Sequence, residues 1–113
     1  MTVSVLSEFV QVLTTVESEG KAKEIADSLL RQRLAACVQV SGPISSSYWW
    51  NDKIEHAHEW ICLAKSRSQD YDRIEAAIKS THPYELPEIL AIPVIHGNID
   101  YLHWIYKETA PKH

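Results

Sequence analysis

The amino-terminal part of the chain changes from a strand-like to a helix-like pattern of apolar residues. Phe9–Val16 is short, rich in β-branched residues and bounded by polar residues, which is typical of a strand. From Ser18 onward, apolar residues recur at spacings of three and four, which predicts an amphipathic helix with Ser18 as its N-cap. The apolar positions of that helix are Ala22, Ile25, Ala26, Leu29 and Leu30.

The middle of the chain predicts a long β-hairpin. Residues 35–50 are extended in character, and Gly42-Pro43 within them predicts a bend or a bulge. Asn51-Asp52 then supplies two residues that tolerate turn geometry, and residues 53–66 form the return strand.

The carboxy-terminal part predicts a helix, a strand and a short helix. The first helix covers about residues 69–81 with Ser68 as its cap, and residues 88–95 form an apolar strand. Pro93 cannot donate to a neighbouring strand, so it favours a sheet edge or a bulge. A short helix follows Gly97-Asn98 and places Tyr101, Trp104 and Ile105 on one face.

The order of these elements is β-α-β-β-α-β with an extra C-terminal helix, which predicts an α+β, ferredoxin-like sandwich with a long hairpin. The length of 113 residues and the mass of 12.9 kDa fit one domain, so we predict a single domain over residues 1–113.

The return strand predicts an oligomer. From Trp60 to Ala64 its residues are apolar on both faces of the strand. Two helices cover one face of an antiparallel sheet, so the second apolar face requires another cover. In so small a chain we expect that cover to be another subunit.

Charge and composition exclude several classes of function. The net charge of −4 disfavours nucleic acid as a partner. The longest uncharged stretch, residues 34–51, holds too many polar residues to span a membrane. Residues 1–6 lack the basic start of a secretion signal, so we expect a cytoplasmic protein. No phosphate loop, metalloprotease motif or nucleophile elbow is present, so we predict neither an enzyme nor an organic cofactor.

The loop of residues 81–88 is the first candidate for chemistry. It holds His82, Tyr84, Glu85 and Glu88 among two prolines that stiffen the backbone. Such a loop can bind a cation or a polar metabolite at a low ordering cost. The alternative is a turn in which the imidazole closes the preceding helix and the carboxylates are solvated.

Other residues suggest metal ligands. His56 and His58 lie on one side of a strand, where two imidazoles can hold a divalent metal such as copper or zinc, or else face solvent. Cys37 and Cys62 could ligate Cu(I) only if they approach each other in space, and inert core thiols are the alternative.

We also predict a ligand pocket between subunits. Lys65 ends the strand before the second long helix, so we expect it near the loop that holds His82, Tyr84 and Glu88. A neighbouring subunit's hairpin tip would add Trp50, giving aromatic walls around a small polar ligand. The alternative is an interface network in which Lys65 pairs with the carboxylate of Glu59 or Glu88.

Several motifs, in order, resemble the divalent-cation tolerance protein family (CutA). They are Leu34-Ala35-Ala36-Cys37-Val38, Tyr48-Trp49-Trp50 with Lys53, Leu63-Ala64-Lys65, His82-Pro83-Tyr84-Glu85 with Pro87-Glu88, Pro93-Val94, and Gly97-Asn98 with Tyr101-Leu102 and Trp104. The resemblance implies a ferredoxin-like domain assembled as a homotrimer, cytosolic in bacteria, and associated with tolerance of copper and other divalent metals.

The resemblance also implies where a copper site would lie. Family members with an assigned site use a Cys at the end of the first strand and a His-His pair before Pro-Tyr. The matching positions here are Thr14, Thr81 and His82, and threonine hydroxyls are poor copper ligands. We therefore expect weak copper binding through His82, His56 and His58.

These observations lead to one functional hypothesis and two alternatives. The hypothesis is a trimeric, non-enzymatic binding or signalling protein associated with the response to divalent metal ions, chiefly copper. The alternatives are a metabolite sensor or enzyme with a site between subunits, and a trimeric scaffold that presents a rigid surface to another protein.

Overall fold

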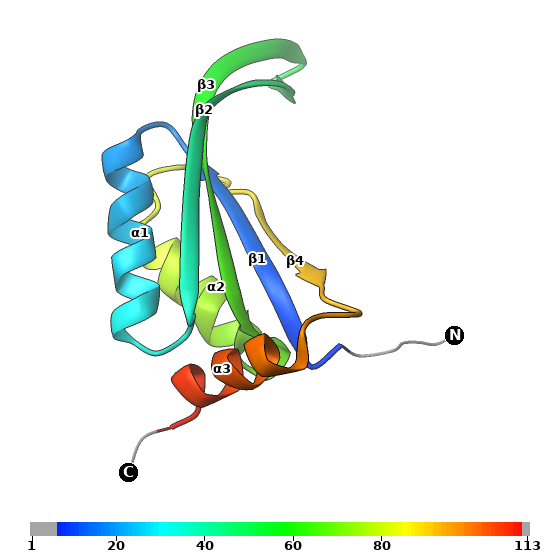
Figure 1. The fold of residues 1–113 in the computed structure, drawn as a ribbon. Helices are drawn as coiled ribbons and strands as arrows, with labels where there is room; N and C mark the ends of the chain where they lie inside the picture. The colour runs from blue at the N-terminus through cyan, green and yellow to red at the C-terminus, as the bar shows by residue number, and fades with distance from the viewer. Residues whose placement is uncertain (1–6, 112–113) are drawn as a thin grey trace.

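The order of elements predicted from the sequence is present in a computed structural model, which describes residues 7–111 (Figure 1). Residues 1–6, on which the predicted absence of a secretion signal depends, lie outside the described part. The elements are β1 (Phe9–Val16), α1 (Glu19–Arg31), β2 (Cys37–Trp50), β3 (Lys53–Arg67), a 3-10 turn (Ser68–Asp70), α2 (Tyr71–Thr81), β4 (Ile89–Pro93) and α3 (Ile99–Thr109).

The strands form one antiparallel sheet in the order β2-β3-β1-β4. The helices α1 and α2 lie together on one face, and α3 crosses one end of the sheet (Figure 1). The core lies between the first face and the two helices, where Val12, Ile25, Leu29, Ile74 and Ile78 are each at most 1% exposed. The alternation of the strands and the spacing of the helices together direct these side chains inward.

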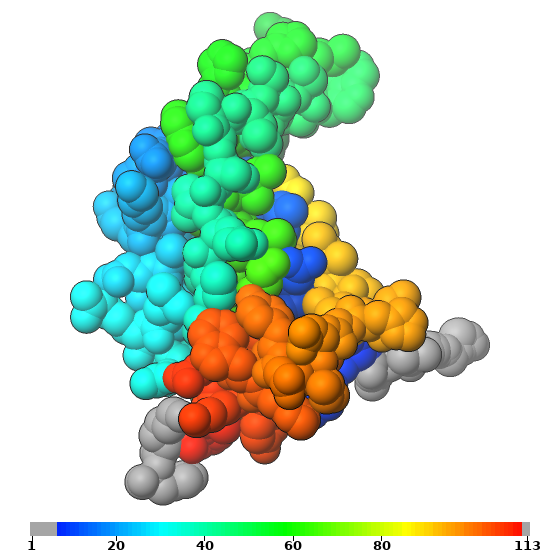
Figure 2. Space-filling view, in the orientation of Figure 1, coloured from blue at the N-terminus to red at the C-terminus, as the bar shows by residue number. Residues whose placement is uncertain are grey.

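The hairpin of β2 and β3 has the predicted bulge and turn. The strand register shifts between Ser41 and Ile44, on either side of Gly42-Pro43. A Cβ atom at Gly42 would lie 2.7 Å from the Trp60 ring, so only glycine fits there. Beyond the bulge, the hairpin arches past the body of the molecule (Figures 1 and 2).

The turn at the hairpin tip also agrees with the prediction. Asn51 and Asp52 both have positive φ, at 51° and 63°. Two such residues in a row form the two-residue turn whose twist matches that of the flanking strands. The tip is therefore a tight connection, and it keeps Trp50 at the very end of β2.

The caps of the helices agree with the prediction in one case and differ in another. The Ser18 hydroxyl accepts a hydrogen bond of 3.1 Å from the amide of Lys21, which confirms the cap of α1. The predicted cap at Ser68 is wrong, because a 3-10 turn intervenes and α2 begins after Asp70. The Asp70 carboxylate is buried there beside the guanidinium of Arg67, 3.2 Å away.

The last strand is shorter than predicted. β4 covers Ile89–Pro93 and pairs with β1 alone, so it is an edge strand, as Pro93 indicated. The amide of Val94 still donates to the carbonyl of Phe9, after which the chain turns toward α3. Asn98 caps α3 by accepting from the amides of Asp100 and Tyr101.

The face of the sheet opposite α1 and α2 carries a strip of apolar residues, which we call the open face. The strip consists of Leu13, Ile61, Leu63, Leu90 and Ile92, as the strand register aligns them. Leu90 is 54% exposed and Ile92 is 41% exposed. The second apolar face inferred from β3 is thus present, and Leu90 and Ile92 are exposed on it.

None of the helices within residues 7–111 is long and apolar enough to cross a bilayer.

Candidate functional site

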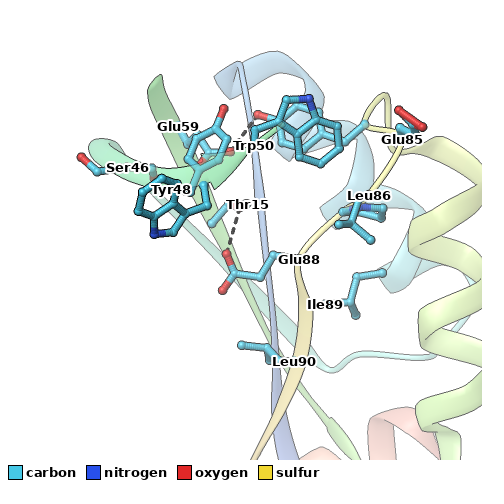
Figure 3. A pocket seen from close by; sticks show the side chains of 14 residues that line it. Thr15, Ser46, Tyr48, Trp50, Glu59, Glu85, Leu86, Glu88, Ile89 and Leu90 are labelled. Carbon is cyan, nitrogen blue, oxygen red and sulfur yellow. Dashed lines mark hydrogen bonds between the residues drawn. The ribbon is translucent and has the colours of Figure 1, made fainter. Parts of the chain in front are cut away.

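A cavity lies beneath the arched hairpin (Figure 3). We call this cavity of about 830 Å³ the hairpin cleft. Its walls come from the end of β1, the hairpin, the loop after α2 and the start of β4. The lining residues are Thr15, Ser46, Ser47, Tyr48, Trp49, Trp50, Glu59, Tyr84, Glu85, Leu86, Pro87, Glu88, Ile89 and Leu90.

A hydrogen bond between the loop and the hairpin closes one wall of the hairpin cleft. The hydroxyl of Tyr84 donates to Oε2 of Glu59 over 2.8 Å. Burial raises the pKa of Tyr84 above its usual value, and the hydrogen bond to Glu59 and that group's negative charge raise it further. The phenol therefore keeps its proton at neutral pH and serves as a donor to a carboxylate that is only 7% exposed.

A second contact joins the loop to the sheet. Thr15 Oγ1 donates a hydrogen bond of 3.3 Å to Oε1 of Glu88, drawn as a dashed line in Figure 3. Thr15 lies at the end of β1, where it pairs with Ile61 of β3. Two carboxylates, those of Glu59 and Glu88, are therefore held at the cleft by the hydroxyls of Tyr84 and Thr15.

His82 is fixed by backbone groups on both sides of its ring. Its Nδ1 accepts a hydrogen bond of 3.1 Å from the amide of Tyr84. Because Nδ1 is the acceptor, Nε2 carries the proton, and it donates over 2.8 Å to the carbonyl of Thr15. His82 lies beside the cleft without lining it, and neither ring nitrogen is available to a metal unless one of these bonds breaks.

The predicted proximity of Lys65 to the loop is wrong. β3 ends at Arg67, and the 11 residues of α2 then carry the chain back by about 16 Å toward the other end of the sheet. Lys65 pairs with Gln11 and Cys37 in the strand register, and its ammonium group donates to the side chain of Gln11. Lys65 thus lies six positions along β3 from Glu59, or about 20 Å away.

Three of the predicted pocket residues lie at one cavity, whereas His82 and Lys65 do not line it. Tyr84, Glu88 and Trp50 all line the hairpin cleft. In this structure the hairpin above the loop belongs to the same chain, so Trp50 reaches the cleft without a neighbouring subunit (Figure 3).

The two hairpin histidines lie away from the cleft. His56 and His58 are exposed on the arm of β3, and Nδ1 of His56 is 2.9 Å from Oγ of Ser47. Among residues 7–111, no three His, Cys, Asp or Glu side chains gather in a way that could hold a metal ion.

The two cysteines lie on opposite faces of the sheet. The Cys62 thiol is in the core and donates to the carbonyl of Ala22, and burial raises its pKa to about 11. Cys37 aligns with Lys65 on the side of the open face. Both are free cysteines. Because they lie on opposite faces of the sheet, the condition for a shared Cu(I) site is not met.

Thr14 and Thr81, which the resemblance matched to copper ligands, lie in the interior and at the end of α2. Thr14 is 1% exposed, and its hydroxyl has no hydrogen-bond partner within the described residues. The Thr81 hydroxyl donates to the carbonyl of Ile78 over 3.3 Å. Neither group offers a ligand that copper prefers.

Sequence reasoning missed the full role of two residues of the cleft. Glu59 was considered only as a partner of Lys65, and Thr15 was not considered. The signal for Glu59 was present, since it is the carboxylate next to Ile61 and Leu63 on the side of β3 that presents these apolar residues. No sequence pattern distinguishes Thr15 from the other β-branched residues of β1.

Comparison with known proteins identifies the family. Residues 10–108 match the family described as CutA1 divalent ion tolerance protein. The chain belongs to this family. A CutA protein of Thermus thermophilus, called a divalent-cation tolerance protein, is 38% identical over 99 residues, which cover 88% of this chain and 96% of the relative. Protein CutA of mouse is 41% identical over 95 residues, but the match covers only 54% of that longer protein.

The fold agrees with the family as well. The structure described as the periplasmic divalent cation tolerance protein CutA from Archaeoglobus fulgidus superposes with a TM-score of 0.87 at 37% identity, covering 89% of this chain and 98% of the other. The four-stranded antiparallel sheet with three helices is therefore the architecture of CutA1 proteins, and the predicted family is confirmed.

Proposed function

We propose that this CutA1 family member is a non-enzymatic binding or signalling protein that acts as a homotrimer in the response to divalent metal ions, chiefly copper, and binds metal only weakly. The observation that carries the proposal is the state of His82, whose two ring nitrogens are both taken by backbone groups. Threonines occupy the other two positions of the family's copper site, so direct metal binding falls to the exposed pair His56 and His58.

The open face supports the trimeric part of the proposal. Leu90 and Ile92 lie at the edge of the sheet with large exposed fractions, next to the half-buried Leu13. Burying such a strip against another copy removes apolar surface from water and stabilises the assembly.

The chemistry of the hairpin cleft supports a binding role over catalysis. Tyr84 keeps its proton because its pKa is raised, so it is a poor general base. Its partner Glu59 is occupied by that hydroxyl through one oxygen. These groups are suited to holding a ligand.

We also place the protein in the cytoplasm. Both cysteines are free thiols, which fits a reducing compartment. The Archaeoglobus relative is described as periplasmic, so fractionation of cells that express the full chain is the appropriate test.

Titration with Cu(II) tests the metal part of the proposal. We expect weak binding at pH 7 that decreases as the pH falls, because protons compete with the metal for its ligands. The double variant H56Q/H58Q should lose most of this binding, whereas the matched control H96Q removes another exposed imidazole and should retain it. A nanomolar site that survives H56Q/H58Q and disappears in H82Q would overturn the proposal.

A second candidate function is the binding of a small polar ligand, and the hairpin cleft favours it. The cavity volume of about 830 Å³ is in the range of small-molecule sites. Its apolar and aromatic walls, together with a few oriented carboxylates, are the usual composition of such sites.

A further inference from the structure

The part of the hairpin beyond the bulge, residues 44–59, carries two imidazoles side by side. We call this part the hairpin arm, and it extends beyond the body of the molecule (Figures 1 and 2). His56 and His58 lie two positions apart on β3, so their side chains point to one side of the strand from Cα atoms about 7 Å apart. Both residues are exposed. The two rings can therefore approach one metal ion, with each ligating nitrogen about 2 Å from it.

The neighbouring strand prepares His56 for metal binding. Ser47 lies opposite His56 in the strand register, and its Oγ is 2.9 Å from Nδ1 of the imidazole. In the tautomer in which Nδ1 carries the proton, the hydroxyl accepts that hydrogen bond and the lone pair of Nε2 is left free. Metal-binding histidines commonly donate from their second nitrogen in this way, which orients the ring. His56 thus differs from His82, whose two nitrogens both bond to the backbone.

One hairpin arm supplies only half of a metal site. Divalent copper and zinc bound by imidazole usually take about four ligands. Within the described part of the chain, no third His, Cys, Asp or Glu gathers with the pair in a way that could complete a site. The remaining positions on the metal are open to water or to further imidazoles, and imidazole is the ligand that suits these metals better. A second copy of the hairpin arm supplies the two imidazoles that are missing.

The pair lies on the side of the sheet that the proposed subunit contact does not use. Along β3, His56 and His58 alternate in phase with Cys62 and Ala64, which are buried in the core beneath the helices. The residues of the open face, such as Leu63, point to the opposite side of the same strand. Burial of the open face in a trimer therefore leaves the two imidazoles available to a second assembly.

We propose that a divalent metal ion such as Cu(II) links two assemblies of this protein, held by His56 and His58 of one hairpin arm and by the same pair of an arm in the second assembly. This inference rests on the proposed weak metal binding at the pair and adds its partner, a second copy of the chain. A single link is weak, but links between several arms of two trimers act together and strengthen the association. The size of the assembly then depends on the concentration of the metal.

A titration of the purified full chain with Cu(II) at pH 7, followed by light scattering, tests the proposal. We expect the mean mass to at least double, with about half an equivalent of bound Cu(II) per chain in calorimetry, because two arms share one ion. Removal of the metal with EDTA should restore the starting mass. Mg²⁺, which prefers oxygen ligands, should leave the mass unchanged.

Glutamine variants then locate the site. H56Q/H58Q should have the same mass as the wild type without metal, which shows that it folds and assembles, and should keep that mass when Cu(II) is added. H96Q is the matched control, because it removes another exposed imidazole outside the hairpin arm. Its mass should rise with Cu(II) as that of the wild type does.

The outcomes separate the inference from the function on which it rests. If Cu(II) binds to the wild type, H56Q/H58Q abolishes that binding and the mass never changes, the metal part of the proposed function stands and the link between assemblies is wrong. If no Cu(II) binds to the wild type, both are wrong. If Mg²⁺ raises the mass equally, or if H56Q/H58Q associates with Cu(II) as the wild type does, the association does not use these imidazoles and the proposal is overturned.

Discussion

The hydroxyl of Tyr84 donates to the buried carboxylate of Glu59 over 2.8 Å, joining the loop after α2 to the root of the hairpin arm. The two residues are 25 positions apart in the sequence. This contact fixes the position of the loop and holds the carboxylate at the hairpin cleft.

We predict that Y84F destabilises the protein by about 1 to 2 kcal/mol near pH 8, because a buried carboxylate loses its donor. The pKa of Tyr84 is raised in the folded protein relative to its unfolded value near 10, so the folded state holds the proton more tightly. The associated stabilisation is complete below about pH 10 and is lost as the pH rises through the raised pKa. Urea unfolding at pH 8 to 11 measures the free energy of unfolding and its dependence on pH.

The comparison with Y84F isolates the phenol from the other titrating groups. The stability of the wild type should fall more steeply above pH 10 than that of Y84F. Parallel pH profiles for the two proteins would contradict the assigned role of Tyr84.

The buried hydroxyl of Thr14 gives a second prediction. Thr14→Val should raise the free energy of unfolding by about 1 kcal/mol, since it replaces an unpartnered hydroxyl with a methyl group of similar shape. Thr15→Val is the control: that hydroxyl donates to Glu88, so its removal should bring no gain. Equal effects at both positions, measured by chemical denaturation at one protein concentration, would show that the partner of the hydroxyl does not matter.

The ion pair between Asp70 and Arg67, just before α2, gives a third prediction. Asp70→Ala should lower the free energy of unfolding by about 3 to 5 kcal/mol, because it leaves the guanidinium of Arg67 buried without its counter-charge. Arg67 also donates to the carbonyl of Thr109 and lies over the ring of Tyr106, so the docking of α3 should loosen as well. Hydrogen exchange of α3 amides reports that loosening.

An exposed pair supplies the control for Asp70. Asp27 contacts Arg31 on the surface of α1 at 2.6 Å, and both side chains are more than half exposed. Asp27→Ala should leave the stability nearly unchanged. A similar loss in both variants would mean that burial does not set the strength of these pairs.

The open face gives a fourth prediction. Leu90→Glu places a charge in the middle of the apolar strip and should shift the assembly toward monomers in sedimentation experiments. Leu30→Glu changes a leucine of α1 that is 39% exposed and should leave the assembly intact. The reverse pattern would place the subunit contact on α1.

The hairpin and the helices could be predicted from the sequence because their signals are local. Alternation along β3 defined its two faces, and Gly42-Pro43 marked the bulge where Trp60 lies against the backbone. The start of α2 could not be predicted correctly, because a 3-10 turn precedes it and Asp70 in that turn is held by an ion pair with Arg67.

The position of Lys65 shows where local reasoning is insufficient. Alternation correctly places Lys65 and Glu59 on the same face of β3, but a shared face does not imply proximity along a strand of 15 residues. β3 and α2 run in opposite directions along the sheet. The loop after α2 therefore lies at the end of the sheet opposite to Lys65. The state of His82 is equally non-local, because it depends on the carbonyl of Thr15 at a separation of 67 residues.

The proposed assembly of three chains would bury the apolar strip of the open face, and light scattering after size exclusion measures the mass of the assembly in one experiment. The purified wild type at micromolar concentration should have about three times the chain mass of 12.9 kDa. A stable species with the mass of a single chain would contradict both the proposed homotrimer and the interpretation of the open face as a subunit contact.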